Sequence, residues 1–145
     1  MKVVVQRVKE AEVWVEGVCV SKIGWGLLLL VGFRKGDTEE KIFKAAKKVT
    51  ELRIFEDEQG KMNLSVKDLN LEILAVPNFT LEGSIEKGRR PSFDECMEPD
   101  KAREFFERFC LAIKNEGVRV SKGVFQAKME VKLVNYGPVT FVLSL

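Results

Sequence analysis

The sequence contains no histidine, so it lacks the side chain that most often serves as a general base near neutral pH. A Ser-His-Asp or Cys-His nucleophile system is therefore excluded, and so is a histidine-ligated metal site. The three cysteines, Cys19, Cys96 and Cys110, have no CxxC spacing and predict neither a disulfide framework nor a zinc site. Any catalysis has to use other groups, with no metal expected.

The stretch VPNFTLEG, residues 76–83, offers one such group. It ends an apolar segment at Pro77 and then presents Asn78, Phe79 and Thr80 where a strand meets a loop. The Thr80 hydroxyl is a nucleophile only if a base activates it, and no lysine is adjacent in the sequence. Backbone amides at such a strand end can instead point into a cleft and stabilise an oxyanion. An ordinary strand terminus explains the same residues, so both interpretations stay open.

Charged residues offer a second kind of chemistry. The acidic run at 56–58 leads to Gly60, so a solvated turn explains it better than paired acid–base catalysis does. Arg89 and Arg90 stand in a long loop beside Phe93 and could grip an RNA backbone if other basic residues converged on them. A net charge of +2 does not by itself predict nucleic-acid binding, and a solvated surface is the plainer interpretation.

Alternating or continuous apolar residues predict the strands that would position these groups. The predicted strands are residues 2–8, 11–21, 26–33, 71–76, 125–134 and 139–145. One amphipathic helix is predicted from a cap at Asp37 to Leu52, and another from about Pro99 to Glu116. This order predicts an α/β fold: a curled, partly closed and barrel-like mixed sheet, mostly antiparallel, with two packed helices.

Length and composition favour one domain. A chain of 145 residues that is 46% hydrophobic supports one buried core but is too short for two, so residues 1–145 are expected to form a single domain. The N-terminus enters a strand rather than a signal peptide, and the longest apolar run is shorter than the roughly 20 residues of a membrane span. With the unpaired cysteines, these features predict a cytoplasmic protein that does not bind a membrane.

Gly137 and Pro138 interrupt the last apolar stretch, VNYGPVTFVLSL. Glycine is the most flexible residue, and proline has no backbone donor for a sheet. The pair therefore predicts a turn or a bulged entrance to the final strand.

Several stretches, taken together in their order and spacing, resemble the D-aminoacyl-tRNA deacylase family over the entire chain. They are QRV at 6–8, GLLLLVG at 26–32, RIF at 53–55, GKMNLSV at 60–66, RPSF at 90–93, GVFQAKMEVKLVN at 123–135 and GPVTF at 137–141. The resemblance implies a homodimeric cytoplasmic hydrolase with active sites at the subunit interface and no cofactor. Its substrate would be the ester that joins a D-amino acid to the 3′ end of tRNA.

The resemblance also implies roles for individual residues. Phe79 and Thr80 match the family motif Ser-Gln-Phe-Thr-Leu, although Pro77 and Asn78 depart from it, and their backbone amides would form the oxyanion site. Water would attack with help from the terminal 2′-hydroxyl of the tRNA. A nucleophilic Thr80 hydroxyl is the alternative.

The Gly137–Pro138 bond would be cis in this resemblance and would reach into the partner subunit's active site, with Arg7 fixing its orientation. Its carbonyls would bind the substrate's α-amino group and occupy the space of an L side chain, while glycine on alanine tRNA would also enter.

Phe125 and Met129 match the family's adenosine pocket, and Arg89 and Arg90 would contact the tRNA acceptor stem. The alternative function is a non-catalytic tRNA- or RNA-binding module on the same fold.

Overall fold

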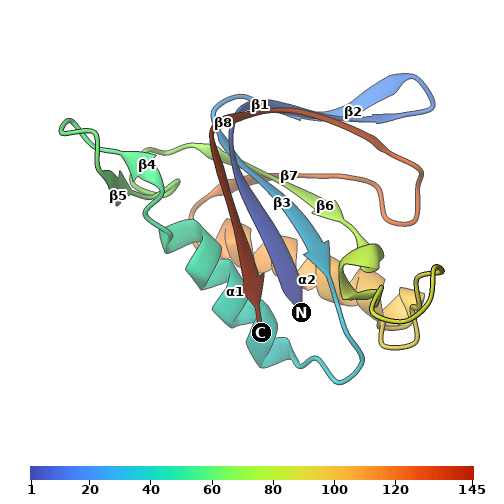
Figure 1. Cartoon of the computed structure of the whole chain (residues 1–145). Helices are drawn as coiled ribbons and strands as arrows, with labels where there is room; N and C mark the ends of the chain where they lie inside the picture. Colours follow the sequence, from blue (N-terminus) through green and yellow to red (C-terminus); the bar gives the residue numbers. More distant parts are fainter.

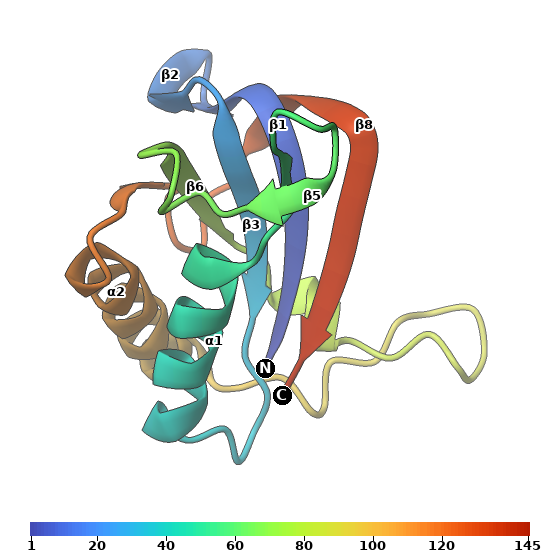
Figure 2. The same cartoon turned by 90° about the vertical axis from the view of Figure 1, so that its left-hand side faces the viewer.

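The computed structural model describes residues 1–145 and shows a curled sheet with two helices packed against one of its faces (Figures 1 and 2). The strands are β1 (Lys2–Val15), β2 (Val18–Ile23), β3 (Gly26–Gly32), β4 (Phe55–Glu56), β5 (Met62–Leu64), β6 (Glu72–Pro77), β7 (Arg119–Lys122) and β8 (Glu130–Ser144). The helices are α1 (Glu39–Glu51), the 3₁₀ turn η1 (Phe79–Glu82) and α2 (Pro99–Asn115). None of the helices has the length and hydropathy that a membrane-spanning helix needs.

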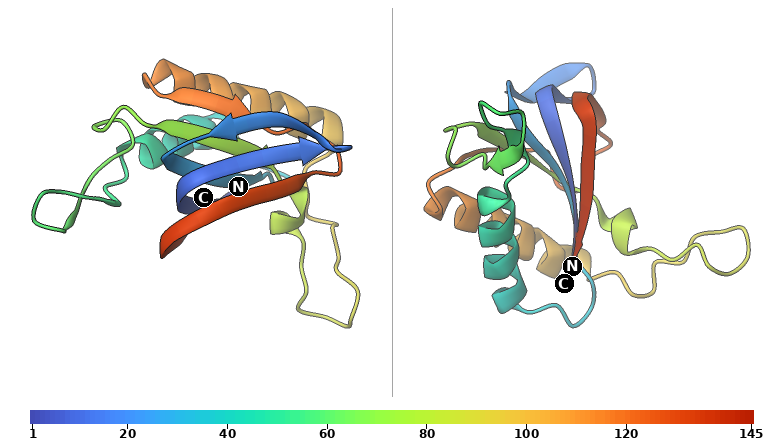
Figure 3. Two further views of the ribbon diagram at one scale, coloured as in Figure 1. Left: turned by 90° about the horizontal axis from the view of Figure 1, so that it is seen from above. Right: turned by 60° about the vertical axis from the view of Figure 1, so that its left-hand side comes forward.

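The main sheet combines antiparallel and parallel pairing. Its strand order is β2-β1-β3-β6-β7, and β8 pairs with β1 outside this order. The long strand β1 is antiparallel to β3 over its first half, to β2 over its second half and to β8 along most of its length. Strands β3, β6 and β7 are parallel, with helices in the crossovers between them. Figure 3 shows the resulting curl, which confirms the barrel-like mixed sheet.

Two apolar clusters lie on opposite faces of this sheet because successive strand residues point to opposite sides. The larger cluster lies under the helices and includes Leu27, Leu29 and Phe106. The smaller cluster lies on the other face and includes Leu28 and Leu74. Strand β3 is therefore buried on both sides, as its continuous apolar sequence indicates.

The second predicted helix is confirmed, but the predicted start of the first is wrong. Helix α2 begins with Pro99 in its first turn, and Gly117 follows it with a φ of 87°. Helix α1 has Thr38, not Asp37, at its N-cap position. Asp37 is buried, and its carboxylate accepts hydrogen bonds from the Arg34 amide and the Lys41 ammonium instead of from an amide of the helix.

One predicted strand start is also wrong, and one short strand of the main sheet was not predicted. The strand expected over 125–134 begins only at Glu130, because the chain before it forms a loop in which Gln126 has a φ of 63°. Strand β7 (Arg119–Lys122) was not predicted, since its four residues carry too little apolar alternation for a strand signal.

Gly137 and Pro138 lie in the middle of β8 rather than at its entrance. Val8 pairs with Asn135 and Gln6 pairs with Thr140, so residues 136–139 lie opposite Arg7 alone. This is a large β-bulge, and the Gly137–Pro138 peptide bond within it is cis. The predicted bulge is thus present, but β8 continues through it.

The close approach of β3 and β6 gives a prediction for Gly26→Ala. A Cβ atom on Gly26 would lie 1.9 Å from the Glu72 carbonyl oxygen, so the two strands would have to separate. We expect the variant to lose at least about 2 kcal/mol of unfolding free energy in urea denaturation. Gly24→Ala is the matched control, because no atom lies within 4 Å of its added Cβ. Equal stability of the two variants would contradict this account of the β3–β6 contact.

Candidate functional site

A cavity of about 820 Å³ lies beyond the end of β6. Its walls come from η1, the 93–98 loop, the first turn of α2 and the 125–131 segment, and most of its lining side chains are hydrophobic. Pro77, Phe79, Phe125 and Met129 all line it. The structure thus brings together residues that are 46–52 positions apart in the sequence. A cavity of this size and character suits a largely apolar, planar ligand group.

The turn η1 borders this cavity through its first residue, Phe79, and through Asn78 before it. The Asn78 amide donates to the Val31 carbonyl at 2.7 Å, which joins the start of the turn to the end of β3. The Leu81 amide donates back to the Asn78 carbonyl. The first amides of a 3₁₀ turn have no acceptor inside the turn, so those of Phe79 and Thr80 remain available for an outside acceptor. An oxygen that gains negative charge would be such an acceptor.

The Thr80 hydroxyl has a partner within the turn. It donates to the Asn78 side-chain oxygen at 2.5 Å. A neutral amide oxygen is not a base that can remove the hydroxyl proton, so this contact does not activate Thr80 as a nucleophile. Thr80 is exposed and does not line the cavity, whereas the neighbouring Phe79 does.

Aromatic side chains frame the cavity. The exposed ring of Phe79 meets Phe93 edge-on at 5.2 Å between centroids. Across the cavity, Phe125 packs against Phe106, and the Arg103 guanidinium lies 4.8 Å from the Phe125 ring centroid. A planar group entering here would find apolar and π surfaces.

Arg7, Gly137 and Pro138 lie apart from this cavity. Arg7 is 3% exposed, and its side chain donates to the Tyr136 carbonyl at 3.0 Å and to the Ile54 carbonyl at 2.9 Å. With Tyr136 it lines a second, smaller cavity of about 390 Å³. Gly137 and Pro138 are exposed and do not line the large cavity of their own chain.

The Asn135 side chain braces the bulge from within. It accepts a hydrogen bond from the Val139 amide at 2.8 Å and donates to the Thr140 hydroxyl at 2.8 Å. With the Arg7 contact to Tyr136, these bonds fix the chain on both sides of Gly137 and Pro138. Asn135 was not predicted to have this role, because its contacts depend on the bulge.

The predicted tRNA-contacting residues Arg89 and Arg90 are exposed. They lie in the loop between η1 and α2, which projects away from the sheet and helices (Figures 2 and 3).

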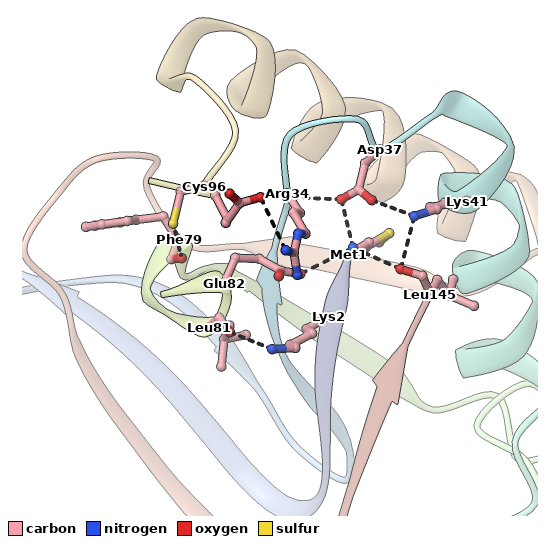
Figure 4. Close-up of polar contacts among 11 residues, drawn as sticks. Met1, Lys2, Arg34, Asp37, Lys41, Phe79, Leu81, Glu82, Cys96 and Leu145 are labelled. Carbon is pink, nitrogen blue, oxygen red and sulfur yellow. Dashed lines mark hydrogen bonds and ion pairs between the residues drawn. The ribbon is translucent and has the colours of Figure 1, made fainter. Parts of the chain in front are cut away.

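A buried ionic cluster lies next to Glu82, at the end of η1 (Figure 4). The α-ammonium of Met1 is 2.7 Å from an Asp37 carboxylate oxygen and 3.2 Å from Glu82 Oε1. It also donates to the Leu145 carbonyl oxygen at 3.2 Å. Burial by itself would raise the Asp37 pKa, but hydrogen bonds from Lys41, Met1 and the Arg34 amide outweigh it and hold the pKa below its ordinary value. Nothing in the sequence pattern pointed to this cluster.

The lowered Asp37 pKa gives a prediction for acid unfolding. A carboxylate with a lowered pKa contributes stability that is present above its unfolded-state pKa, near 3.8, and is lost as the pH falls through the folded-state value. Asp37→Asn should therefore lower stability at neutral pH and weaken its decline below about pH 4. Denaturant unfolding at several pH values would measure this, with Glu58→Gln on an exposed turn as the control. An unchanged acid profile would contradict it.

The curled sheet, the two helices on one face and the apolar cavity beyond the end of β6 define a small α/β domain with one large candidate ligand site. The family model described as D-Tyr-tRNA(Tyr) deacylase matches residues 4–144. The chain belongs to this family, which confirms the resemblance seen in its motifs.

Relatives match along their whole length. The D-aminoacyl-tRNA deacylase of Carboxydothermus hydrogenoformans is 53% identical over 145 residues and is covered completely, as is this chain. The enzyme of the same name from Thermotoga petrophila is 54% identical, with 99% of this chain and 97% of the relative covered.

Solved structures agree with the fold. The c-Myc DNA Unwinding Element Binding Protein has a TM-score of 0.94 and 39% identity, covering 100% of this chain and 99% of its own. A probable eukaryotic D-amino acid tRNA deacylase shares the fold, with a TM-score of 0.85 at 20% identity, covering 98% of this chain and 97% of its own.

Proposed function

We propose that this protein hydrolyses the ester bond of D-aminoacyl-tRNA and releases the free D-amino acid and tRNA. Family membership supports the reaction class. The observation that supports the proposal is the turn η1, whose first residue Phe79 lines a large apolar cavity that Phe125 and Met129 also line. In this proposal the amides bind the carbonyl oxygen of the ester and the cavity binds the terminal adenosine of the tRNA, so no catalytic side chain is needed.

The two amides supply the electrostatic part of the mechanism. Water attacks the ester carbonyl carbon, and the carbonyl oxygen takes up negative charge that the Phe79 and Thr80 N–H groups stabilise. The bond to the tRNA 3′-oxygen then breaks, and that oxygen takes a proton. The adjacent 2′-hydroxyl of the tRNA assists the proton transfers in place of the missing histidine.

The tRNA is held by two regions of different character. The terminal adenine enters the apolar cavity against Phe125 and Met129. Arg89 and Arg90, on the projecting loop, contact acceptor-stem phosphates, which position the substrate without selecting its sequence.

Chirality is read by the bulge of a second subunit. In this proposal the chain is a homodimer, and Gly137 and Pro138 enter the partner's cavity, where their carbonyls bind the α-amino group and exclude an L side chain. Their exposure, and their bracing by Arg7 and Asn135, support this role. Glycine has no side chain to exclude, so glycine carried by alanine tRNA is a second substrate.

Residues 1–145 act as a single deacylase domain in this proposal, and the site of action is the cytoplasm. The three cysteines are free, which fits a reducing compartment.

A comparison of the hydrolysis of D-tyrosyl-tRNA and L-tyrosyl-tRNA tests the proposed function directly. Purified protein is incubated with D-tyrosyl-tRNA and, in parallel, with L-tyrosyl-tRNA, and the released tyrosine is measured over many turnovers. We expect fast release of D-tyrosine and little release of L-tyrosine. Binding of tRNA without release of D-tyrosine beyond the uncatalysed rate would instead identify a non-catalytic RNA-binding module.

The variant Thr80→Ala distinguishes a catalytic role of the Thr80 backbone amide from one of its hydroxyl group. We expect kcat to fall by less than about tenfold, because the amide survives the change while the hydroxyl contact to Asn78 is lost. Single-turnover hydrolysis of D-tyrosyl-tRNA measures the effect, and circular dichroism verifies the fold. Complete loss of activity in a folded variant would show that the hydroxyl is the nucleophile.

A further inference from the structure

Two side chains to which the proposed reaction assigns no chemical step contact the turn η1 (Figure 4). Glu82, the last residue of the turn, is ion-paired with the Met1 α-ammonium at 3.2 Å. At the other end of the turn, the Cys96 thiol donates to the Phe79 carbonyl oxygen at 3.4 Å. The turn is therefore held at both ends, at Glu82 by the ion pair and at Phe79 by the thiol of Cys96, which also lines the large cavity.

The ion pair of Glu82 and Met1 is deeply buried. The side chains of the two residues are 2% and 0% exposed. Asp37 Oδ2 and the Leu145 carbonyl oxygen also lie close to the ammonium, at 2.7 Å and 3.2 Å. Glu82 Oε1 makes no hydrogen bond, so charge attraction to the ammonium is what compensates this buried oxygen. Displacing Glu82 would leave its carboxylate buried without a counter-charge, which is strongly unfavourable. The end of η1 consequently has one favoured position.

The fixed position of Glu82 also limits the orientation of the Phe79 and Thr80 amides, because all three residues belong to one short turn. Glu82 follows Phe79 by three residues, and the 3₁₀ turn between them is closed by the bond from the Leu81 amide to the Asn78 carbonyl. A displacement of Glu82 would therefore tilt the Phe79 and Thr80 amides as well. Oxyanion stabilisation depends steeply on the aim of its donors, so such a tilt would affect turnover.

The Cys96 contact acts on the same amides by a second route. The Phe79 carbonyl and the Thr80 N–H belong to one peptide group, so a donor on that carbonyl orients the group and strengthens the N–H as a donor. Burial, with a smaller contribution from the Glu82 charge, raises the pKa of the Cys96 thiol and keeps its proton in place. Cys96 is itself anchored, since its amide donates to the Phe93 carbonyl at 3.0 Å.

We infer that Glu82, through its ion pair with the Met1 ammonium, and Cys96, through the Phe79 carbonyl, are positioning residues for ester hydrolysis. Both act through η1, and this inference rests on the proposed function. Loss of either contact should lower kcat more than it changes KM, because the amides act on charge that develops only in the transition state.

Glu82→Gln and Asp37→Asn form the first matched pair. Each removes one carboxylate from the Met1 ammonium, but only Glu82 belongs to η1. We expect Glu82→Gln to lower the kcat for D-tyrosyl-tRNA about tenfold, and Asp37→Asn to change it less than about twofold. Thermal unfolding of both variants shows whether they are folded at the assay temperature. Equal losses of kcat in the two folded variants would overturn the inference.

Cys96→Ala and Cys96→Ser form the second pair, and they remain decisive if Glu82→Gln does not fold. The alanine variant removes the donor to Phe79, whereas serine keeps a hydroxyl donor of similar size. We expect kcat to fall about threefold in Cys96→Ala, and Cys96→Ser to recover most of that loss. Wild-type kcat in Cys96→Ala, or equal loss in both variants, would overturn the role of Cys96.

The wild-type protein, assayed alongside, separates the two proposals. If it fails to hydrolyse D-tyrosyl-tRNA, the proposed function is wrong. If it hydrolyses the substrate and the matched pairs show no contrast, only the inference on positioning is wrong.

Discussion

The buried ammonium of Met1 connects parts of the chain that are far apart in sequence. Through Asp37, Glu82 and Leu145 it joins the first strand to the segment before α1, to the turn η1 and to the end of the last strand. A buried charge is tolerated only with close partners, so these segments must meet at one point. The N- and C-termini accordingly lie side by side (Figure 1), and η1 takes its place at the edge of the large cavity.

This arrangement suits a chain without histidine. A site made of peptide groups has no side chain whose pKa must be tuned, but its donors are only as well aimed as the backbone that carries them. Here the backbone is held by the Asn78 contact to β3, by the ion pair of Glu82 and by the thiol of Cys96. In the proposed mechanism, the rigidity of the fold around η1 therefore takes the place of side-chain chemistry.

The sequence predicted the layers of the fold well because they depend on local apolar patterns. The stripe on α2 and the continuous apolar run of β3 each specify a buried surface. The false strand over 125–129 shares those patterns, and only the tertiary fold decides that this segment lines a cavity as a loop. The sequence around Asp37 matches a helix-capping pattern, but in the structure its carboxylate forms an ion pair with the Met1 ammonium. In both cases the outcome depends on residues distant in the sequence, so the neighbouring residues do not predict it.

Some candidate site residues could be predicted from the sequence motifs, whereas others depend on contacts that only the folded chain makes. The motif match predicted Phe79, Phe125 and Met129, and the structure places all three at one cavity. Glu82 and Cys96 could not be found from the sequence, since each gains its partner only when β1 and the 93–98 loop pack against η1. The position of Gly137 and Pro138 within β8 also depended on pairing with β1, which a local pattern does not reveal.

The bulge in β8 has a further consequence for the colloidal behaviour of the protein. Strand β8 pairs only with β1, so its outer edge is open, and Val134, Phe141 and Val142 are exposed along it. A long, regular open edge is a template on which other chains add strands and aggregate. The irregular backbone of residues 136–139 interrupts that template midway, leaving two short edge segments. The same bulge thus protects the molecule against uncontrolled strand addition.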